Sequence, residues 1–246
     1  MIKTRVITTL LWDGTALVKG HGFHARRRVG SMMQAIRVCD LRQIDELIIL
    51  DVMASPNGQG PRFAALKELT AHCFMPVAIG GGVRTLDHIR ELLLAGADKA
   101  VIGSALFDRV LIQEASERFG AQAVVAAIDV RDGRVITECG SKINDICPIC
   151  MARQVAEDGA GEIIITSISR DGSESGFDCD LIQRVSAAVS VPVVAAGGAG
   201  EYAHLLDAIN HGADAVAVGA GFLFTDMTPQ GARQYLHDHG IPVRLS

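Results

Sequence analysis

The stretch PVAIGGG at residues 76–82 decides the fold, because PVVAAGG at residues 192–198 repeats its pattern of an apolar run that ends in glycines. The tripeptide GAD at residues 96–98 returns at residues 212–214 with the same offset. A register that holds through several elements predicts a duplicated unit of strand, helix, strand and helix. Two such units in one chain belong to the α/β class and predict a (β/α)8 TIM barrel built from two half-barrels.

Glycines follow the expected strands at equivalent points of both halves. Gly103-Ser104-Ala105 in the first half falls opposite Gly219-Ala220-Gly221 in the second. Backbone N–H groups that no side chain covers can approach an anion closely. One Gly-Gly after a strand is weak evidence, but two copies in register predict two facing phosphate sites and a substrate with phosphate at both ends. The expected phosphate-binding residues are Gly81, Gly82, Gly103 and Ser104 in the first half, and Asp171, Gly172, Gly197, Gly198, Gly219 and Ala220 in the second.

Length and composition fit one barrel domain that covers residues 1–246. A chain of 246 residues with 49% hydrophobic content can bury a large core. The net charge of −5 and the aromatic content of 4% exclude the charged stripes and stacking platforms of nucleic-acid binders. The N-terminus lacks the pattern of a signal peptide, and no stretch approaches the roughly 18 apolar residues that span a bilayer. We therefore expect a cytoplasmic protein without nucleic-acid or membrane partners.

Six scattered cysteines indicate thiols in a reducing compartment. Only the segment CPIC at residues 147–150 has the spacing of a metal or redox motif, and a second pair that would complete a zinc site is missing. The sequence favours an ordinary helix start here, with a functional role for Cys147 and Cys150 as the alternative. We expect no metal and no cofactor.

Eight β-branched runs alternate with helical patterns along the chain. One predicted helix follows Thr85 as its cap and stops at Gly96, and residues 201–211 mirror it. The expected strands are residues 5–11, 46–51, 76–79, 99–102, 123–129, 162–167, 191–195 and 215–218. The longest irregular segments are expected at residues 14–30, 54–61, 131–145 and 169–177, on the side where barrel enzymes place their chemistry.

Two acids stand at the ends of apolar strands. Asp51 ends the second expected strand and Asp129 ends the fifth. A partly buried carboxylate at the mouth of a barrel can have a raised pKa and can transfer protons. We interpret Asp129 as a functional acid and assign Asp51, with Lys19, to the substrate loop, while for Asp51 the capping of nearby loop N–H groups is the stronger alternative.

Four charged residues stand at the other ends of the strands: Arg5, Glu46, Lys99 and Glu162. If these two cations and two anions point inward, they form a closed neutral ring on the barrel floor, which is costly to bury unless every member is paired. Such a ring could gate a passage, whereas each residue considered alone is more typical of a solvated surface. Passage also requires a bore that is not filled from end to end.

The chain resembles the HisF family, the cyclase subunit of imidazole glycerol phosphate synthase, over nearly its whole length. The sister isomerase family, HisA, shares the duplication but lacks these motifs in this form. The segments that carry the resemblance are LVKG at 17–20, DELIILD at 45–51, GGGVRT at 80–85, GADK at 96–99, GAGEI at 159–163, TSISRDG at 166–172 and GGAG at 197–200.

The resemblance implies an activity and a partner. In that family a glutaminase releases ammonia, which crosses the barrel and attacks a bisphosphorylated ribulosyl intermediate to give imidazole glycerol phosphate and an aminoimidazole carboxamide ribotide. By position, Lys19 matches a loop lysine near substrate, Asp129 one of two catalytic aspartates, and Asp98 a residue that faces the glutaminase. The family's ammonia gate falls on Arg5, Glu46, Lys99 and Glu162.

One position departs from the family pattern. Leu11 stands where the resemblance places the other catalytic aspartate, and a leucine cannot transfer a proton. Asp13 has the same strand parity, but we interpret it as the family's loop Asp-Gly. Chains with this departure resemble HisF-like paralogues that accompany a second glutaminase and a sugar amidotransferase in surface-polysaccharide (lipopolysaccharide) pathways. Gly103 and Gly219-Ala220 also replace larger family residues.

Two hypotheses stay open. In the first, the chain is an enzyme, an ammonia-using lyase that acts on a phosphorylated small molecule with Asp129 as general acid or base. In the second, it is a non-catalytic conduit that activates a HisH-like glutaminase in a heterodimer and passes ammonia to another protein. An isomerase of the HisA type needs both acids and is disfavoured by Leu11.

Overall fold

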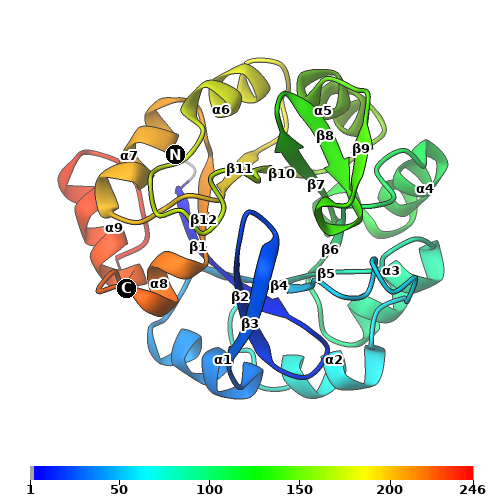
Figure 1. The fold of residues 1–246 in the computed structure, drawn as a ribbon, viewed down its shortest axis with the longest axis horizontal. Helices are drawn as coiled ribbons and strands as arrows, with labels where there is room; N and C mark the ends of the chain where they lie inside the picture. The colour runs from blue at the N-terminus through cyan, green and yellow to red at the C-terminus, as the bar shows by residue number, and fades with distance from the viewer. Residues whose placement is uncertain (1–2, 246) are drawn as a thin grey trace.

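The computed structural model describes residues 3–245, and within them eight parallel strands close into a barrel (Figure 1). Neighbours around the barrel follow the order β1, β4, β5, β6, β7, β10, β11 and β12, and β12 pairs back with β1. The predicted TIM barrel is confirmed. The strands are β1 Arg5–Trp12, β4 Glu46–Asp51, β5 Val77–Gly80, β6 Lys99–Ile102, β7 Val124–Arg131, β10 Glu162–Ser167, β11 Val193–Ala196 and β12 Ala215–Val218.

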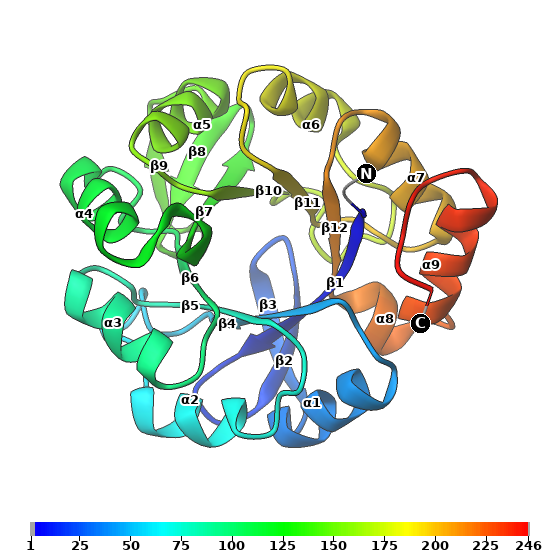
Figure 2. The same cartoon turned by 180° about the vertical axis from the view of Figure 1, so that it is seen from behind.

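Helices surround the barrel, as Figure 2 shows from the face where the strands begin. The short α8 lies between β12 and the last helix. The helices are α1 Met32–Leu41, α2 Phe63–Thr70, α3 Leu86–Leu94, α4 Arg109–Phe119, α5 Pro148–Glu157, α6 Cys179–Ser186, α7 Tyr202–Asn210, α8 Ala220–Phe224 and α9 Pro229–Asp238, with 3-10 turns η1 Ala121–Ala123 and η2 Glu138–Gly140. In the described part of the chain, none of them is both long and apolar enough to cross a bilayer.

The two halves repeat a side-chain hydrogen bond as well as a sequence. Asp98 accepts a hydrogen bond from the N–H of Val77 at 2.8 Å, and Asp214 accepts one from the N–H of Val193 at 2.9 Å. Each aspartate therefore ties the start of one strand to the turn before the next. The predicted start of α3 is also confirmed, because the Thr85 hydroxyl accepts a hydrogen bond from the N–H of His88.

The core has two parts because side chains alternate between the faces of each strand. Outward residues such as Val6 and Leu10 pack under the helices and are fully buried. Inward residues fill the middle of the barrel with a separate apolar cluster, which contains Ile7, Ile48, Ala78, Val101, Val125, Ile164, Val194, Ala215 and Ala217.

Two of the segments expected to be irregular are β-hairpins, so that expectation is wrong. Segment 14–30 contains β2 Leu17–His21 and β3 His24–Gly30, and β2 pairs antiparallel with β1. Segment 131–145 contains β8 Arg134–Thr137 and β9 Lys142–Asn144, which extend β7 in the same way. Both hairpins form because β1 and β7 run past the barrel rim and offer free edges. Figure 1 shows β2 and β3 across the barrel opening.

The predicted boundaries of β4, β6, β10 and β12 are confirmed, and those of β1, β5, β7 and β11 differ from the observed ones by one or two residues. β5 and β11 begin after Pro76 and Pro192, because proline has no N–H to donate to a ladder. β7 runs to Arg131, two residues beyond the predicted end, since Arg131 pairs with Arg134 of the hairpin.

Candidate active site

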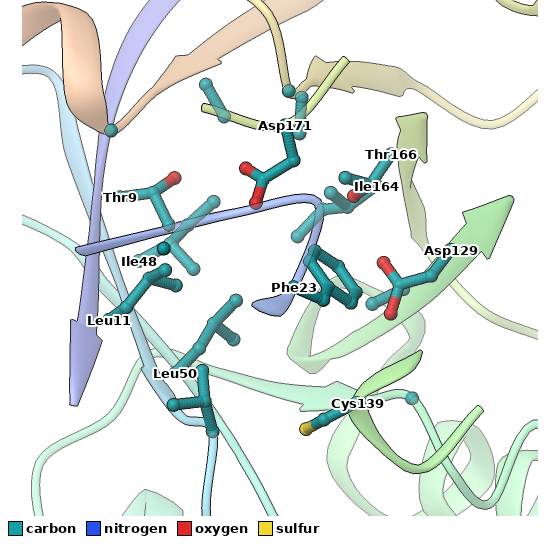
Figure 3. Close-up of a pocket in the computed structure, with 18 of the residues that line it drawn as sticks. Thr9, Leu11, Phe23, Ile48, Leu50, Asp129, Cys139, Ile164, Thr166 and Asp171 are labelled. Carbon is teal, nitrogen blue, oxygen red and sulfur yellow. The ribbon is translucent and has the colours of Figure 1, made fainter. Parts of the chain in front are cut away.

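A pocket of about 180 Å³ opens where the barrel strands end (Figure 3). The structure brings together in it every residue that the sequence assigned to the catalytic centre, the substrate loop and the two phosphate cradles. These lining residues are Lys19, Asp51, Asp129, Gly81, Gly82, Gly103, Ser104, Asp171, Gly172, Gly197, Gly198, Gly219 and Ala220. Among residues 3–245, no group of three or more His, Cys, Asp or Glu side chains is placed to hold a metal ion.

Asp129 lies near the end of β7, and Figure 3 shows its carboxylate turned into the pocket. Burial raises the pKa of this carboxylate to about 7, with a smaller contribution from the charge of Asp171, while the Thr166 hydroxyl opposes the shift. A group with this pKa exchanges protons readily near neutral pH. The geometry and the pKa therefore suit the acid or base role expected for Asp129.

Asp171 belongs to the turn after β10, and its carboxylate also points into the pocket (Figure 3). Burial raises the pKa of Asp171, although the N–H of Phe23 donates a hydrogen bond to the carboxylate and opposes the shift, as do the charges of His21 and Arg26. The sequence placed Asp171 in a phosphate cradle. A carboxylate repels phosphate, so in this pocket the side chain suits proton transfer better than anion binding.

Leu11 lines the pocket at the end of β1, where it presents an apolar side chain. Asp13 lies just after β1, and its carboxylate is bound within the loop. Its carboxylate accepts hydrogen bonds from the N–H groups of Thr15 and Ala16 and from Arg28 Nε, and these contacts hold its pKa well below the ordinary value despite an opposing contribution from burial. Asp13 is absent from the lining of the main pocket, in agreement with its interpretation as a loop residue.

Asp51 follows the capping alternative. Its carboxylate accepts hydrogen bonds from the N–H groups of Met53 and Ala54 and from Arg62 Nε at 3.0 Å. With only 2% of the side chain exposed, these bonds occupy most of its capacity. Asp51 therefore shapes the pocket wall through the loop that it caps.

Two glycines of the first cradle, Gly81 and Gly103, are glycines for different structural reasons. Gly81 has φ of 114°, and a Cβ atom there would lie 2.7 Å from the Cβ of Asp51. Gly103 lacks a positive φ, and the nearest atom to an added Cβ is the Ala127 oxygen at 3.9 Å. The backbone therefore requires Gly81, whereas Gly103 keeps space open in the pocket. Ser104, beside it, accepts a hydrogen bond from the N–H of Glu138.

Lys19 on β2 reaches the pocket from the first hairpin. Its Nζ lies 3.3 Å from Glu174 Oε1 and 4.4 Å from the centre of the Phe224 ring. A cation in this position can meet an anionic ligand at the rim, in keeping with the predicted substrate loop.

The floor of the barrel carries the four charged residues in a closed arrangement. Arg5 pairs with both Glu46 and Glu162, and Lys99 Nζ lies 2.7 Å from a carboxylate oxygen of each glutamate. Because β1, β4, β6 and β10 lie around the barrel, these contacts require all four side chains to point inward. Burial opposes ionisation of Glu162, but Arg5 and Lys99 together lower its pKa.

Asp98 lies beside this floor and is exposed. One oxygen of its carboxylate accepts the hydrogen bond from Val77. The side chain therefore has a local structural role and also stays accessible on the face where a partner was expected.

Sequence reasoning missed the aromatic and apolar wall of the pocket. Phe23 stands at the tip of the first hairpin, and Ile48, Leu50 and Ile164 line the pocket from inside the barrel. Strand parity could have placed the last three, because they alternate with outward residues. Nothing in the local sequence places Phe23, since its position depends on how the hairpin folds over the barrel.

Comparison with known proteins gives a consistent result. The family model described as histidine biosynthesis protein matches residues 6–228. The chain is 42% identical to the imidazole glycerol phosphate synthase subunit HisF of Caulobacter vibrioides, over all of this chain and 97% of the relative. It is 38% identical to the subunit of the same name from Chlorobium limicola, over the full length of both. The chain therefore belongs to the histidine biosynthesis protein family, as a HisF-type cyclase subunit of imidazole glycerol phosphate synthase.

Proposed function

We propose that this chain receives ammonia from a HisH-like glutaminase, with which it forms a heterodimer, and that it serves sugar amidation in surface-polysaccharide biosynthesis. The observation that carries the proposal is Leu11, which lines the pocket where the family resemblance places a catalytic aspartate. The retained charged floor supports continued use of ammonia. A phosphorylated small molecule is the ligand of the pocket, and a sugar amidotransferase is the consumer of the nitrogen.

The interior of the barrel supports a short route for ammonia. Ile48, Val101, Ile164 and Ala217 form the bottom of the pocket and come from β4, β6, β10 and β12. In a TIM barrel, inward side chains stack in layers contributed by alternate strands. The next layer down is Ile7, Ala78, Val125 and Val194, from β1, β5, β7 and β11, and it does not reach the pocket.

One apolar layer therefore separates the pocket from the ring of Arg5, Glu46, Lys99 and Glu162. The bore is filled at this layer and is open above it, so it is not filled from end to end. Uncharged ammonia can pass a layer of valine, isoleucine and alanine when side chains move. Ammonium is disfavoured there, because removing its charge from water costs free energy. The ring then acts as the gate and the apolar layer as a filter for the neutral species.

At the mouth, Asp129 and Asp171 supply the proton transfers. Asp129 is the principal acid or base, because it lies on a barrel strand with a pKa near neutrality. Asp171 takes over part of the role that Leu11 cannot perform, since its carboxylate faces the same pocket and also has a raised pKa. The N–H groups of the surrounding glycines remain for phosphate.

The test is turnover of the bisphosphorylated cyclase substrate with free ammonium, for the wild type and for Leu11→Asp. We expect weak turnover in the wild type and an increase of about 10²-fold in Leu11→Asp, because a general acid or base usually raises the rate by about this factor. Leu11→Asn is the matched control, since it has the same size as aspartate and cannot transfer a proton. Wild-type turnover at the level of an ordinary cyclase, unchanged in Leu11→Asp, would rule out the specialisation.

The conduit is the second candidate, favoured by the apolar wall of Leu11, Leu50 and Ile164. Transfer of ¹⁵N from labelled glutamine, in the presence of the glutaminase and the amidotransferase, separates the two. A conduit tolerates Asp129→Asn but is blocked by Ala78→Leu, which overfills the apolar layer. An enzyme loses nitrogen transfer in both variants.

A further inference from the structure

The segment Cys147-Pro148-Ile149-Cys150 forms the start of α5, outside the pocket. Cys147 is the N-cap residue with extended backbone angles, φ −67° and ψ 134°, and Pro148 takes the first helical position. Both cysteines are exposed. Two thiols therefore share the first turn of a ten-residue helix and face solvent.

The two thiols also interact. Cys147 makes no well-formed capping bond, but the N–H of Cys150 approaches its sulfur, as do the N–H of Ile149 and the Cys150 thiol, and Arg184 lies nearby. Together these groups lower the pKa of Cys147, the N–H of Cys150 contributing most. The pKa of Cys147 falls because N–H dipoles at a helix start and a nearby cation stabilise the thiolate.

The other cysteines with a shifted pKa have a raised pKa, in contrast to Cys147. Burial raises the pKa of Cys39 to about 12, that of Cys73 and of Cys139 to about 11, and that of Cys179 above its usual value. Those thiols stay protonated and unreactive at neutral pH. Among the cysteines of residues 3–245, Cys147 alone combines exposure with a lowered pKa and a second exposed thiol three residues away at the start of the same helix.

We propose that Cys147 and Cys150 form a reversible dithiol–disulfide centre that exchanges with low-molecular-weight disulfides of the glutathione type. The Cys147 thiolate attacks one sulfur of the disulfide, whose S–S bond breaks and releases one thiolate, which takes up a proton. Cys150 then loses its proton and attacks the Cys147 sulfur, which releases the second thiol. The protein dithiol is oxidised by two electrons and the small disulfide is reduced to two thiols.

A metal ion fits this turn less well than a disulfide does, because Cys147 and Cys150 are only two ligands. The described residues place no third His, Cys, Asp or Glu side chain beside them. Two cysteines that are three residues apart at a helix start have the spacing of a redox pair. Neither residue lines the pocket, so the centre is independent of the proposed function.

The test exposes the full chain to a series of ratios of reduced to oxidised glutathione, traps free thiols with N-ethylmaleimide and maps them by peptide mass spectrometry. We expect a Cys147–Cys150 disulfide that forms and reverses with the ratio. Cys150→Ser should stop at a mixed disulfide of Cys147 with glutathione, whereas Cys147→Ser should react at least tenfold more slowly. Cys73→Ser, far from α5 in sequence, is the control and should behave as the wild type.

A second measurement covers the case in which a serine variant folds poorly. The rate of alkylation of wild-type Cys147 by iodoacetamide, followed against pH, should rise at lower pH than that of an unstructured CPIC peptide. The proposal is overturned if no disulfide forms at any ratio, if Cys147→Ser reacts as fast as the wild type, or if Cys147 and the peptide titrate together.

Discussion

The two ends of the barrel treat buried charge in opposite ways. On the floor, each cation contacts both carboxylates, and the pKa of Glu162 is lowered. At the mouth, burial raises the pKa of Asp129 to about 7, and no ion pair to either Asp129 or Asp171 is found within residues 3–245. Compensated charge keeps one protonation state, which suits a structural gate. The unpaired carboxylate of Asp129 changes protonation near neutral pH, which suits chemistry.

Breaking the floor ring should have the largest effect on stability. Glu162→Gln leaves Arg5 and Lys99 with one carboxylate between them, so we expect a loss of about 3 kcal/mol in the free energy of unfolding. Urea denaturation with an unchanged m-value measures it. In the wild type, the contribution of Glu162 is complete above its ordinary pKa of 4.5 and is lost as the pH falls further.

A second variant sharpens that result. Glu162→Gln combined with Lys99→Met restores a neutral ring, and we expect it to recover at least about 1 kcal/mol relative to additive losses. Glu91→Gln, which removes an exposed pair with Arg90, is the control and should change stability by less than about 0.5 kcal/mol. Strict additivity would mean that the four charges do not act as one unit.

Neutralising Asp129 should have an intermediate and pH-dependent effect. The folded pKa of about 7 exceeds the ordinary 3.8, so the wild type loses stability as the pH rises from about 4 to about 7. Asp129→Asn removes this loss, so the variant should gain about 1–2 kcal/mol over the wild type by pH 8, less than a fully buried group would give because the pocket admits water. Calorimetric Tm against pH measures the difference. Asp132→Asn, on an exposed turn, is the control, and equal slopes for all three proteins would contradict the raised pKa.

Filling the mouth at Gly103 should have the smallest effect on the fold. Gly103→Ala places a methyl in open space, so stability should change by less than about 1 kcal/mol, while affinity for a ligand that uses this space should fall several-fold. Gly81→Ala is the contrast, since its backbone angle and the nearby Asp51 should cost more than about 1 kcal/mol. Thermal unfolding measures the stability of the two variants, and calorimetric titration with inorganic phosphate measures their affinity. Equal losses of stability in Gly103→Ala and Gly81→Ala would refute the different roles assigned to the two glycines.

The sequence predicted the barrel well because the duplication fixes the alternation of strands and helices. The convergence of Asp129, Gly81 and Gly197 also followed, since the C-terminal ends of parallel strands share one face. The hairpins were missed because β2 and β8 form only where β1 and β7 extend beyond the rim and offer an edge. Phe23 could not be placed for the same reason.

By itself, the sequence determined which residues meet at each end of the barrel, because strand order and parity decide both. Only the tertiary structure decided what those residues do there. Asp51 became a cap because Arg62 and two loop N–H groups reach it, while burial raises the pKa of Asp129 and no salt bridge to it is found among residues 3–245. Protonation depends on burial and on the distance to neighbouring charges, and these quantities exist only once the chain has closed on itself.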